Sequence, residues 1–204
     1  MIYLIGGAPR TGKSIIAKRL MQELSIPWVS TDVFRTVANS LLSPEEQKIR
    51  FPYGGFTSAD QLSDMDLTQM ISWQITEGES LQTFIQSFIG HQIGVMDSHI
   101  IEGVHLLPQT SRLLIDEPTF KDQIKTLHIV STDIDMQLAA MRKNTSHFDW
   151  LSGASDKTFE AVAHFVVGYG KWIKDECEKH QLPYIERKGQ FEEENAQILS
   201  LLKS

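Results

Sequence analysis

The sequence is poor in cysteine and in long apolar runs, and each shortage excludes a class of protein. Cys177 is the only cysteine among 204 residues, so neither a disulfide framework nor a cysteine-based zinc site is available. No apolar run approaches the roughly 18 residues that a membrane span requires. The first apolar run begins at residue 2, with no charged leader and cleavage site before it. We therefore expect a protein of the reducing cytoplasm that does not enter a membrane.

Basic residues are also in the minority. The chain has 19 lysines and arginines against 26 acidic residues, which gives a formal net charge of −7. Nucleic-acid surfaces are normally basic, so this balance argues against a nucleic-acid partner and against a polynucleotide kinase. It does not exclude an anionic small molecule, because such a site needs only a few local cations. The hydrophobic fraction of 41% is enough for a sizeable core, and the length fits one α/β domain over residues 1–204 with a small lid.

Strand and helix patterns alternate along the chain. Short apolar runs predict five strands, at residues 2–7, 26–32, 99–108, 126–132 and 183–186. Stretches with helical periodicity predict helices at residues 13–24, 33–42, 64–90, 133–141, 156–180 and 191–203. The helix at 33–42 is expected to be capped by Thr31 or Asp32, and the helix at 64–90 to be broken near Gly78. Such alternation is typical of a three-layer α/β/α fold around a mostly parallel five-stranded sheet.

A glycine-flanked loop joins the first strand to the first helix. It reads Gly7-Ala8-Pro9-Arg10-Thr11-Gly12-Lys13-Ser14 and fits the pattern G-x-x-x-x-G-K-[ST]. The two glycines permit backbone conformations that let successive amides surround an anion at the helix N-terminus. Lys13 can reach the β- and γ-phosphates, and the Ser14 hydroxyl suits Mg²⁺. We expect these eight residues to bind a nucleotide polyphosphate; the alternative is an ordinary glycine-rich turn.

Charged residues follow the second and third predicted strands, where ligands of parallel sheets bind. Asp32 could accept a proton from an acceptor hydroxyl or hold the metal through water, and Arg35 could clamp an anionic substrate. Alternatively, Asp32 only caps its helix and Arg35 is solvated. Glu102 is expected near Mg²⁺ or the attacking group, or it is a strand-terminal charge paired with a lysine. His105 is as readily a structural residue as a substrate contact.

Two further segments are expected to border the site. Residues 43–63 have two prolines, a Gly-Gly pair and no sustained period, which predicts a long loop of the kind that forms lids or binding elements. With the helices that follow, as far as residue 90, it would form the acceptor side. Its aromatic stretch, residues 50–56, either covers the acceptor or pins the loop to the core.

The second of these segments, residues 142–155, is the predicted lid. Arg142, ahead of Lys143, could close over the transferring group and neutralise its charge, or both could be solvated at a helix C-terminus. Arg10 could contact the γ-phosphate or a second substrate, or face solvent. The tryptophans are interpreted as packing residues; they are Trp28, Trp73, Trp150 and Trp172.

Four stretches resemble the 2-phosphoglycerate kinase family of P-loop kinases. They read "GGAPRTGKS", "IPWVSTDVFR", "IIEGVHLLP" and "KHQLPYIE" and span residues 2–186. The resemblance implies a P-loop kinase fold and Mg²⁺-dependent phosphoryl transfer from ATP to a hydroxyl of a small acceptor. The chain departs from the family at Pro9 and Arg10, where small residues are usual, and at Ile15, where a second hydroxyl residue is common.

The resemblance also assigns roles by position. Lys13 and Ser14 would hold phosphates and metal, Asp32 and Arg35 would face the acceptor, and Glu102 would stand near the metal, whereas Arg142 matches only a basic stretch. The sequence thus favours a kinase with an anionic small-molecule acceptor and Asp32, or else Glu102, as the base. The alternative is a nucleotide-dependent switch, or slow ATPase, that acts through a protein partner.

Overall fold

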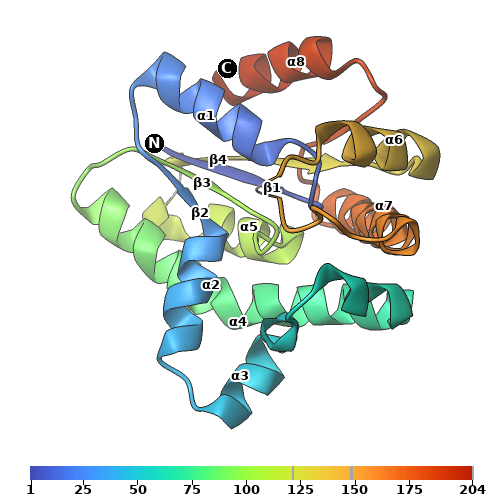
Figure 1. Ribbon diagram of the computed structural model, residues 1–204. Coiled ribbons are helices and arrows are strands. Elements are labelled where there is room, and N and C mark those ends of the chain that lie inside the picture. The colour runs from blue at the N-terminus through green and yellow to red at the C-terminus, as the bar shows by residue number, and fades with distance from the viewer. Residues whose placement is uncertain (121, 148, 204) are drawn as a thin grey trace.

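A five-stranded parallel sheet forms the centre of the protein (Figure 1), in a computed structural model that describes residues 1–120, 122–147 and 149–203. The strands lie in the order β2-β3-β1-β4-β5, and every neighbouring pair is parallel. They are β1 (Ile2–Gly7), β2 (Trp28–Ser30), β3 (His99–Glu102), β4 (Ile124–Val130) and β5 (Tyr184–Glu186). The predicted α/β fold with a five-stranded sheet is confirmed.

Helices cover both faces of the sheet. The α-helices are α1 (Lys13–Leu24), α2 (Thr31–Ser40), α3 (Pro44–Arg50), α4 (Leu67–Gly94), α5 (Pro108–Asp116), α6 (Ile134–Asn144), α7 (Asp156–Lys179) and α8 (Phe191–Lys203). The 3₁₀ turns are η1 (Pro52–Gly55), η2 (Ala59–Asp64) and η3 (Pro118–Phe120). No helix within the described ranges is long and apolar enough to span a bilayer.

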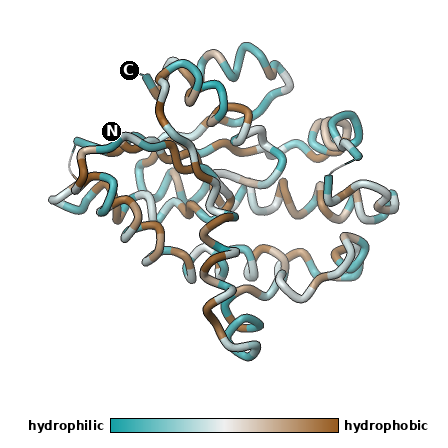
Figure 2. The backbone as a smooth tube through the Cα atoms, turned by 60° about the vertical axis from the view of Figure 1, so that its left-hand side comes forward, coloured by the Kyte–Doolittle hydropathy of each residue, from teal (hydrophilic) through white to brown (hydrophobic). Residues whose placement is uncertain are grey.

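The side chains of β1 alternate between two apolar layers, as a strand requires. Tyr3 and Ile5 pack with α1 and α8, whereas Ile2 and Leu4 pack on the opposite face, where α4 and α5 lie. Figure 2 shows apolar residues concentrated along the central strands. Burial on both faces explains why β1 is a continuous apolar run rather than an alternating one.

The register of the sheet brings Glu102 close to the strand end that precedes Asp32. Glu102 at the end of β3 pairs in register with Ser30 of β2 on one side and with Ile5 of β1 on the other. The carboxyl ends of these three parallel strands therefore meet at one edge of the sheet. The loop after β1 and the helix after β2 both begin there.

The second strand is shorter than predicted. It ends at Ser30, whose hydroxyl accepts a hydrogen bond at 3.3 Å from the amide of Asp32 and so caps α2. The predicted caps, Thr31 and Asp32, are therefore wrong, because both residues already belong to the helix. Because the helix starts earlier, the Asp32 carboxylate does not cap it, and the Asp32 side chain is 75% exposed.

The predicted loop at residues 43–63 consists largely of short helices. Ser43 and Glu46 form a capping box at the start of α3, and Ser58 and Gln61 form another at η2. Both follow the spacing S-x-x-E/Q, which marks helix starts in a sequence. The missing apolar period hid these helices, because none of the side chains of α3 is buried.

Two further expectations about helices and strands are wrong. The helix α4 continues through Gly78, where a Cβ would lie 2.6 Å from Cγ of Leu107, so glycine serves close packing and not a break. The third strand ends at Glu102 instead of residue 108, and the helix α5, absent from the prediction, begins at Pro108. Proline suits this first position because its missing amide hydrogen would have no helical partner.

Candidate active site

The loop between β1 and α1 has backbone conformations that require glycine. Gly7 has φ of 135°, and a Cβ there would lie 2.0 Å from the carbonyl oxygen of Ile129. Gly12 has φ of 87° and precedes α1, which no side chain caps. The first amides of α1 are therefore left to bind an anion, which the positive end of the helix also favours.

Lys13 lies inside this loop. Its side chain is only 6% exposed, and Nζ donates a hydrogen bond of 2.7 Å to the carbonyl oxygen of Ala8. The Thr11 hydroxyl donates to the same oxygen at 2.8 Å. Burial lowers the pKa of Lys13, and the nearby Glu102 and Asp32 carboxylates oppose that shift. A buried ammonium held by a single carbonyl oxygen is well placed to exchange that oxygen for those of a phosphate.

Arg187, which the sequence analysis did not identify, hydrogen-bonds to the backbone of this loop. Arg187 follows β5, and its Nε donates to the carbonyl oxygen of Thr11 at 3.0 Å. The rest of its guanidinium contacts Glu194 at 3.2 Å and Asn195 at 2.9 Å, and it lies 4.6 Å from the ring centroid of Phe191. The loop is thereby tied to α8, at the far end of the sequence.

Ser14 and Glu102 come together, as their predicted roles require. The Ser14 hydroxyl donates to Oε1 of Glu102 at 3.1 Å, and Glu102 is only 3% exposed. Burial raises the pKa of Glu102, while Lys13 and Ser14 oppose that shift. A hydroxyl beside a desolvated carboxylate fits Mg²⁺, which takes oxygen ligands. The described residues contain no group of three or more acidic, histidine or cysteine ligands, so phosphate oxygens and water would complete the shell.

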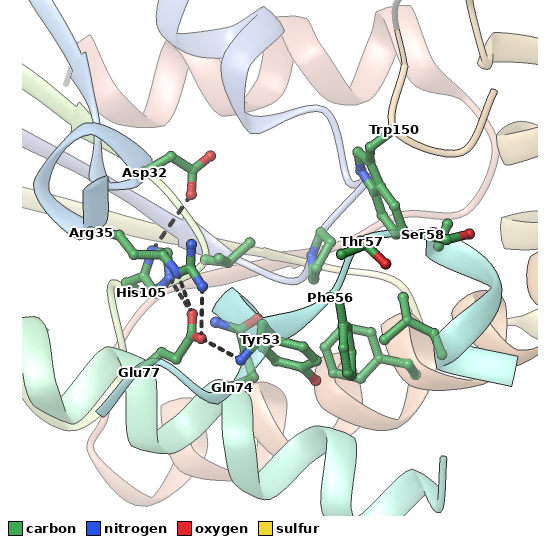
Figure 3. Close-up of a pocket in the computed structure, with 15 residues that line it drawn as sticks. Asp32, Arg35, Tyr53, Phe56, Thr57, Ser58, Gln74, Glu77, His105 and Trp150 are labelled. Atoms are coloured by element: carbon green, nitrogen blue, oxygen red, sulfur yellow. Dashed lines mark hydrogen bonds and ion pairs between the residues drawn. The ribbon is translucent and has the colours of Figure 1, made fainter. Parts of the chain in front are cut away.

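A cavity of about 690 Å³ lies beside this loop (Figure 3). Pro9 of the loop, Asp32 of α2 and residues of η1, α4 and α7 line it. The Asp32 side chain is 75% exposed, and its Oδ1 lies 3.7 Å from Nδ1 of His105. Nδ1 also lies 3.0 Å from the hydroxyl of Thr31. Asp32 is thus an accessible carboxylate at the wall of a cavity large enough for a small substrate.

A buried glutamate that the sequence analysis did not identify holds Arg35. Glu77 of α4 accepts hydrogen bonds from Nε of Arg35 at 2.7 Å, from a terminal nitrogen of Arg35 at 3.1 Å and from the amide of Tyr53 at 3.0 Å. Nε2 of His105 lies 3.4 Å away. Burial alone would raise the pKa of Glu77, but the contacts with His105 and Arg35 outweigh it and lower this pKa. Arg35 faces the cavity, as expected, but its charge is already balanced.

Arg10 is paired with an acidic side chain instead of facing solvent, and its contact with the γ-phosphate or a second substrate stays a prediction. It has φ of 63°, and both terminal nitrogens of its guanidinium donate to the carboxylate of Asp149. The guanidinium carbon lies 5.6 Å from the ring centroid of Trp150, which lines the cavity and is exposed. The interpretation of Trp150 as a packing residue is therefore wrong. The other three tryptophans pack against apolar or aromatic neighbours: Trp28, Trp73 and Trp172.

Arg142 is separated from the other predicted site residues. It lies in the last turn of α6, its side chain is 48% exposed, and it donates to Asp156 at 2.7 Å. It does not line the cavity. The predicted lid, residues 142–155, includes Phe148, which lies outside the described residues.

His128 of β4 lies beneath the loop and makes stability sensitive to acid. It is fully buried, its Nε2 lies 3.2 Å from the hydroxyl of Ser111, and burial together with the charge of Lys13 lowers its pKa from 6.5 to about 3. Below pH 6.5 only the unfolded chain takes up this proton, so acid favours unfolding. One unit below that value, the free energy of unfolding should fall by about 1.4 kcal/mol from this residue.

Chemical denaturation at about pH 7.5 and about pH 5.5 tests this expectation. The loss of stability between the two pH values should be smaller in His128→Gln than in the wild type by about 1.4 kcal/mol. An equal loss in both proteins would contradict it. Carboxylates that titrate in this range affect both proteins alike and cancel in the comparison.

Comparisons with known proteins support the fold. The chain matches no protein-family model, and no curated protein sequence matches it significantly. Its structure resembles a sugar kinase from Janibacter sp. HTCC2649, with a TM-score of 0.55 and 15% identity over 99% of this chain and 94% of that one. It also resembles a gluconokinase from Sinorhizobium meliloti 1021, with a TM-score of 0.51 and 13% identity over 99% and 90%. At such identities the likeness shows a shared fold alone.

Proposed function

We propose that this chain is a small-molecule kinase that transfers the γ-phosphoryl group of ATP to a hydroxyl of its substrate. The observation that carries the proposal is the position of the cavity beside the loop. The phosphate loop, the Ser14–Glu102 pair and Asp32 share one edge of the sheet, and the 690 Å³ cavity opens beside them. A nucleotide-dependent switch needs the loop but not an acceptor cavity with an accessible carboxylate. The resemblance of four sequence stretches to 2-phosphoglycerate kinases also favours the kinase class.

The loop binds the nucleotide in this proposal. The amides at the start of α1 and Nζ of Lys13 bind the phosphates, and Lys13 leaves the carbonyl oxygen of Ala8 for them. Ser14 and Glu102 would hold Mg²⁺. When bound, the ion neutralises charge on the β- and γ-phosphate oxygens. Glu102 is committed to this position by its hydrogen bond with Ser14.

Asp32 acts on the acceptor. Its carboxylate takes the proton of the acceptor hydroxyl while the hydroxyl oxygen forms a bond to the γ-phosphorus. At the same time the bond between the γ-phosphorus and the oxygen that bridges it to the β-phosphate breaks, and ADP leaves. We prefer Asp32 to Glu102 as the base because Asp32 lines the acceptor cavity and Glu102 does not. Arg35 fixes the wall of the cavity through Glu77. Arg142 would neutralise the transferring group only after it leaves Asp156.

A coupled assay for ADP release tests the proposal. ATP and Mg²⁺ are kept constant, and phosphorylated hydroxy acids, sugars, nucleosides and amino alcohols are added one at a time. We expect one class of acceptor to raise ADP release at least about tenfold above the basal rate, with phosphate found on the acceptor by mass spectrometry. ATP turnover that no acceptor changes would contradict the kinase and favour a switch that acts through a partner.

A further inference from the structure

The cavity beside the phosphate loop has no surplus positive charge. Among the described residues that line it, Asp32 and Glu77 are acidic and Arg35 is the only lysine or arginine. Two nitrogens of Arg35 already donate to Glu77, at 2.7 and 3.1 Å. Even a protonated His105 would bring the sum of charges only to zero. Among the described lining residues, no lysine or arginine pairs with Asp32, whose neighbour in the wall is His105 at 3.7 Å.

The other basic residues predicted for the site are also engaged. Arg10 pairs with Asp149, and Arg142 donates to Asp156 at 2.7 Å. Lys13 lies in the loop, where the proposed nucleotide takes it up. An anionic acceptor would therefore approach the Asp32 carboxylate with no free lysine or arginine of the described cavity wall to offset its charge, which opposes its binding.

One polar group in the cavity wall lacks a partner. Gln74 of α4 lines the cavity and is 5% exposed, and its Nε2 has no hydrogen-bond partner within the described part of the chain. Figure 3 shows Gln74 between Glu77 and the ring of Tyr53. Buried amides are nearly always hydrogen-bonded in folded proteins, so this one points to a ligand oxygen.

Aromatic side chains form much of the remaining wall, together with Thr57, Ser58, Ala59, Leu62 and Val104. The ring of Tyr53 lies 5.8 Å from that of Phe56 and 6.3 Å from that of Phe165, measured between centroids. Trp150 lines the cavity together with Pro9 of the loop. Such a surface gains free energy by covering an apolar ring or chain and gains nothing from a compact, highly hydrated anion.

We propose that the acceptor is an alcohol without net negative charge, with an oxygen that faces Gln74 and an apolar part that covers the aromatic wall. The proposal rests on the proposed kinase function. This proposal differs from the anionic acceptor that the sequence favoured. That expectation relied on a free Arg35, and the sequence does not reveal that Arg35 pairs with Glu77. In this proposal the charges of the cavity wall decide which acceptor binds, and Glu77 is decisive because it neutralises Arg35.

Matched pairs of acceptors test the preference. Each pair contains an uncharged alcohol and its carboxylate relative: glycerol and glycerate, glucose and glucuronate, phenylethanediol and mandelate. We expect the uncharged member to have the higher kcat/KM, by about tenfold or more, in every pair that is phosphorylated. A higher kcat/KM for the carboxylate members, or for 2-phosphoglycerate above all of them, would overturn the proposal.

Binding measurements separate this proposal from the kinase function. If the full acceptor screen finds no acceptor that changes ATP turnover, the kinase proposal fails, and calorimetry with the matched pairs decides the charge preference by itself. Tighter binding of the uncharged members supports it. Tighter binding of the carboxylates, or binding of neither, overturns it.

The variant Glu77→Gln tests the role of the buried carboxylate directly. It keeps the shape of the side chain but leaves the charge of Arg35 unbalanced, so the ratio of kcat/KM for carboxylate over uncharged acceptors should rise about tenfold. Glu192→Gln is the matched control, because Glu192 contacts the exposed Arg19 through two nitrogens at 2.8 and 3.0 Å, and its ratio should not change. An unchanged ratio in folded Glu77→Gln would overturn the assignment.

A second variant keeps the proposal testable if Glu77→Gln does not fold. Gln74→Leu removes the unpartnered amide without changing any charge. We expect KM for the uncharged acceptor to rise about tenfold, while KM for ATP and the thermal midpoint stay at the wild-type values. An unchanged KM for the acceptor would overturn the contact with Gln74.

Discussion

Replacement of Lys13 by alanine is expected to reduce kcat/KM for phosphoryl transfer by roughly 10²–10³-fold or more, as the loss of one preorganised charge contact in an active site usually does. The fold should persist. Burial disfavours the charged form of Lys13, so its removal relieves that cost. The Ala8 carbonyl oxygen that Lys13 contacts still accepts a hydrogen bond from the Thr11 hydroxyl in the variant. The free energy of unfolding should therefore change by no more than about 1 kcal/mol.

Steady-state kinetics and chemical denaturation of the same preparation measure both effects. Lys18→Ala is the matched control, since Lys18 lies in the same helix with an exposed side chain near the ring of Trp28. Its turnover should equal that of the wild type. Wild-type turnover in Lys13→Ala would mean that the loop does not hold the reacting phosphates.

The parts of the site that the sequence revealed are those that local physics dictates. The phosphate loop was predictable because Gly7 and Gly12 adopt positive φ between an apolar strand and an amphipathic helix, a pattern contained in one short stretch. The meeting of Asp32 with Glu102 near the loop followed from the parallel sheet, whose strands all end at the same edge.

The missed parts depend on partners far apart in the chain. Glu77 lies 42 residues from Arg35 and 28 from His105, and nothing in the sequence around α4 sets it apart from other polar residues of a helix. Gln74, one helical turn earlier, shares its face. Arg187 contacts a loop 176 residues away. These contacts follow from how α4 and α8 pack, so the sequence predicts the polar residues at the strand ends but not the cavity wall formed by α4.

Asp32→Asn should lower kcat by roughly 10²–10⁴-fold, the usual contribution of a positioned base, and change KM for ATP little. Asparagine has nearly the same shape, and the cap of α2 is Ser30, so the fold should not depend on the charge. Stopped-flow or steady-state assays at saturating ATP and acceptor measure kcat. A large rise in KM for ATP with kcat unchanged would instead make Asp32 a metal or structural group.

The companion variant Glu102→Gln separates the two candidate bases. Glu102 contacts Ser14 at 3.1 Å and is buried away from the acceptor cavity, so its replacement should raise the Mg²⁺ concentration needed for half-maximal activity. Asp32→Asn should leave that concentration unchanged, because its exposed carboxylate faces the acceptor side. The reverse pattern would exchange the two roles. In that case Asp32→Asn would alter the Mg²⁺ requirement, and Glu102→Gln would lower kcat alone.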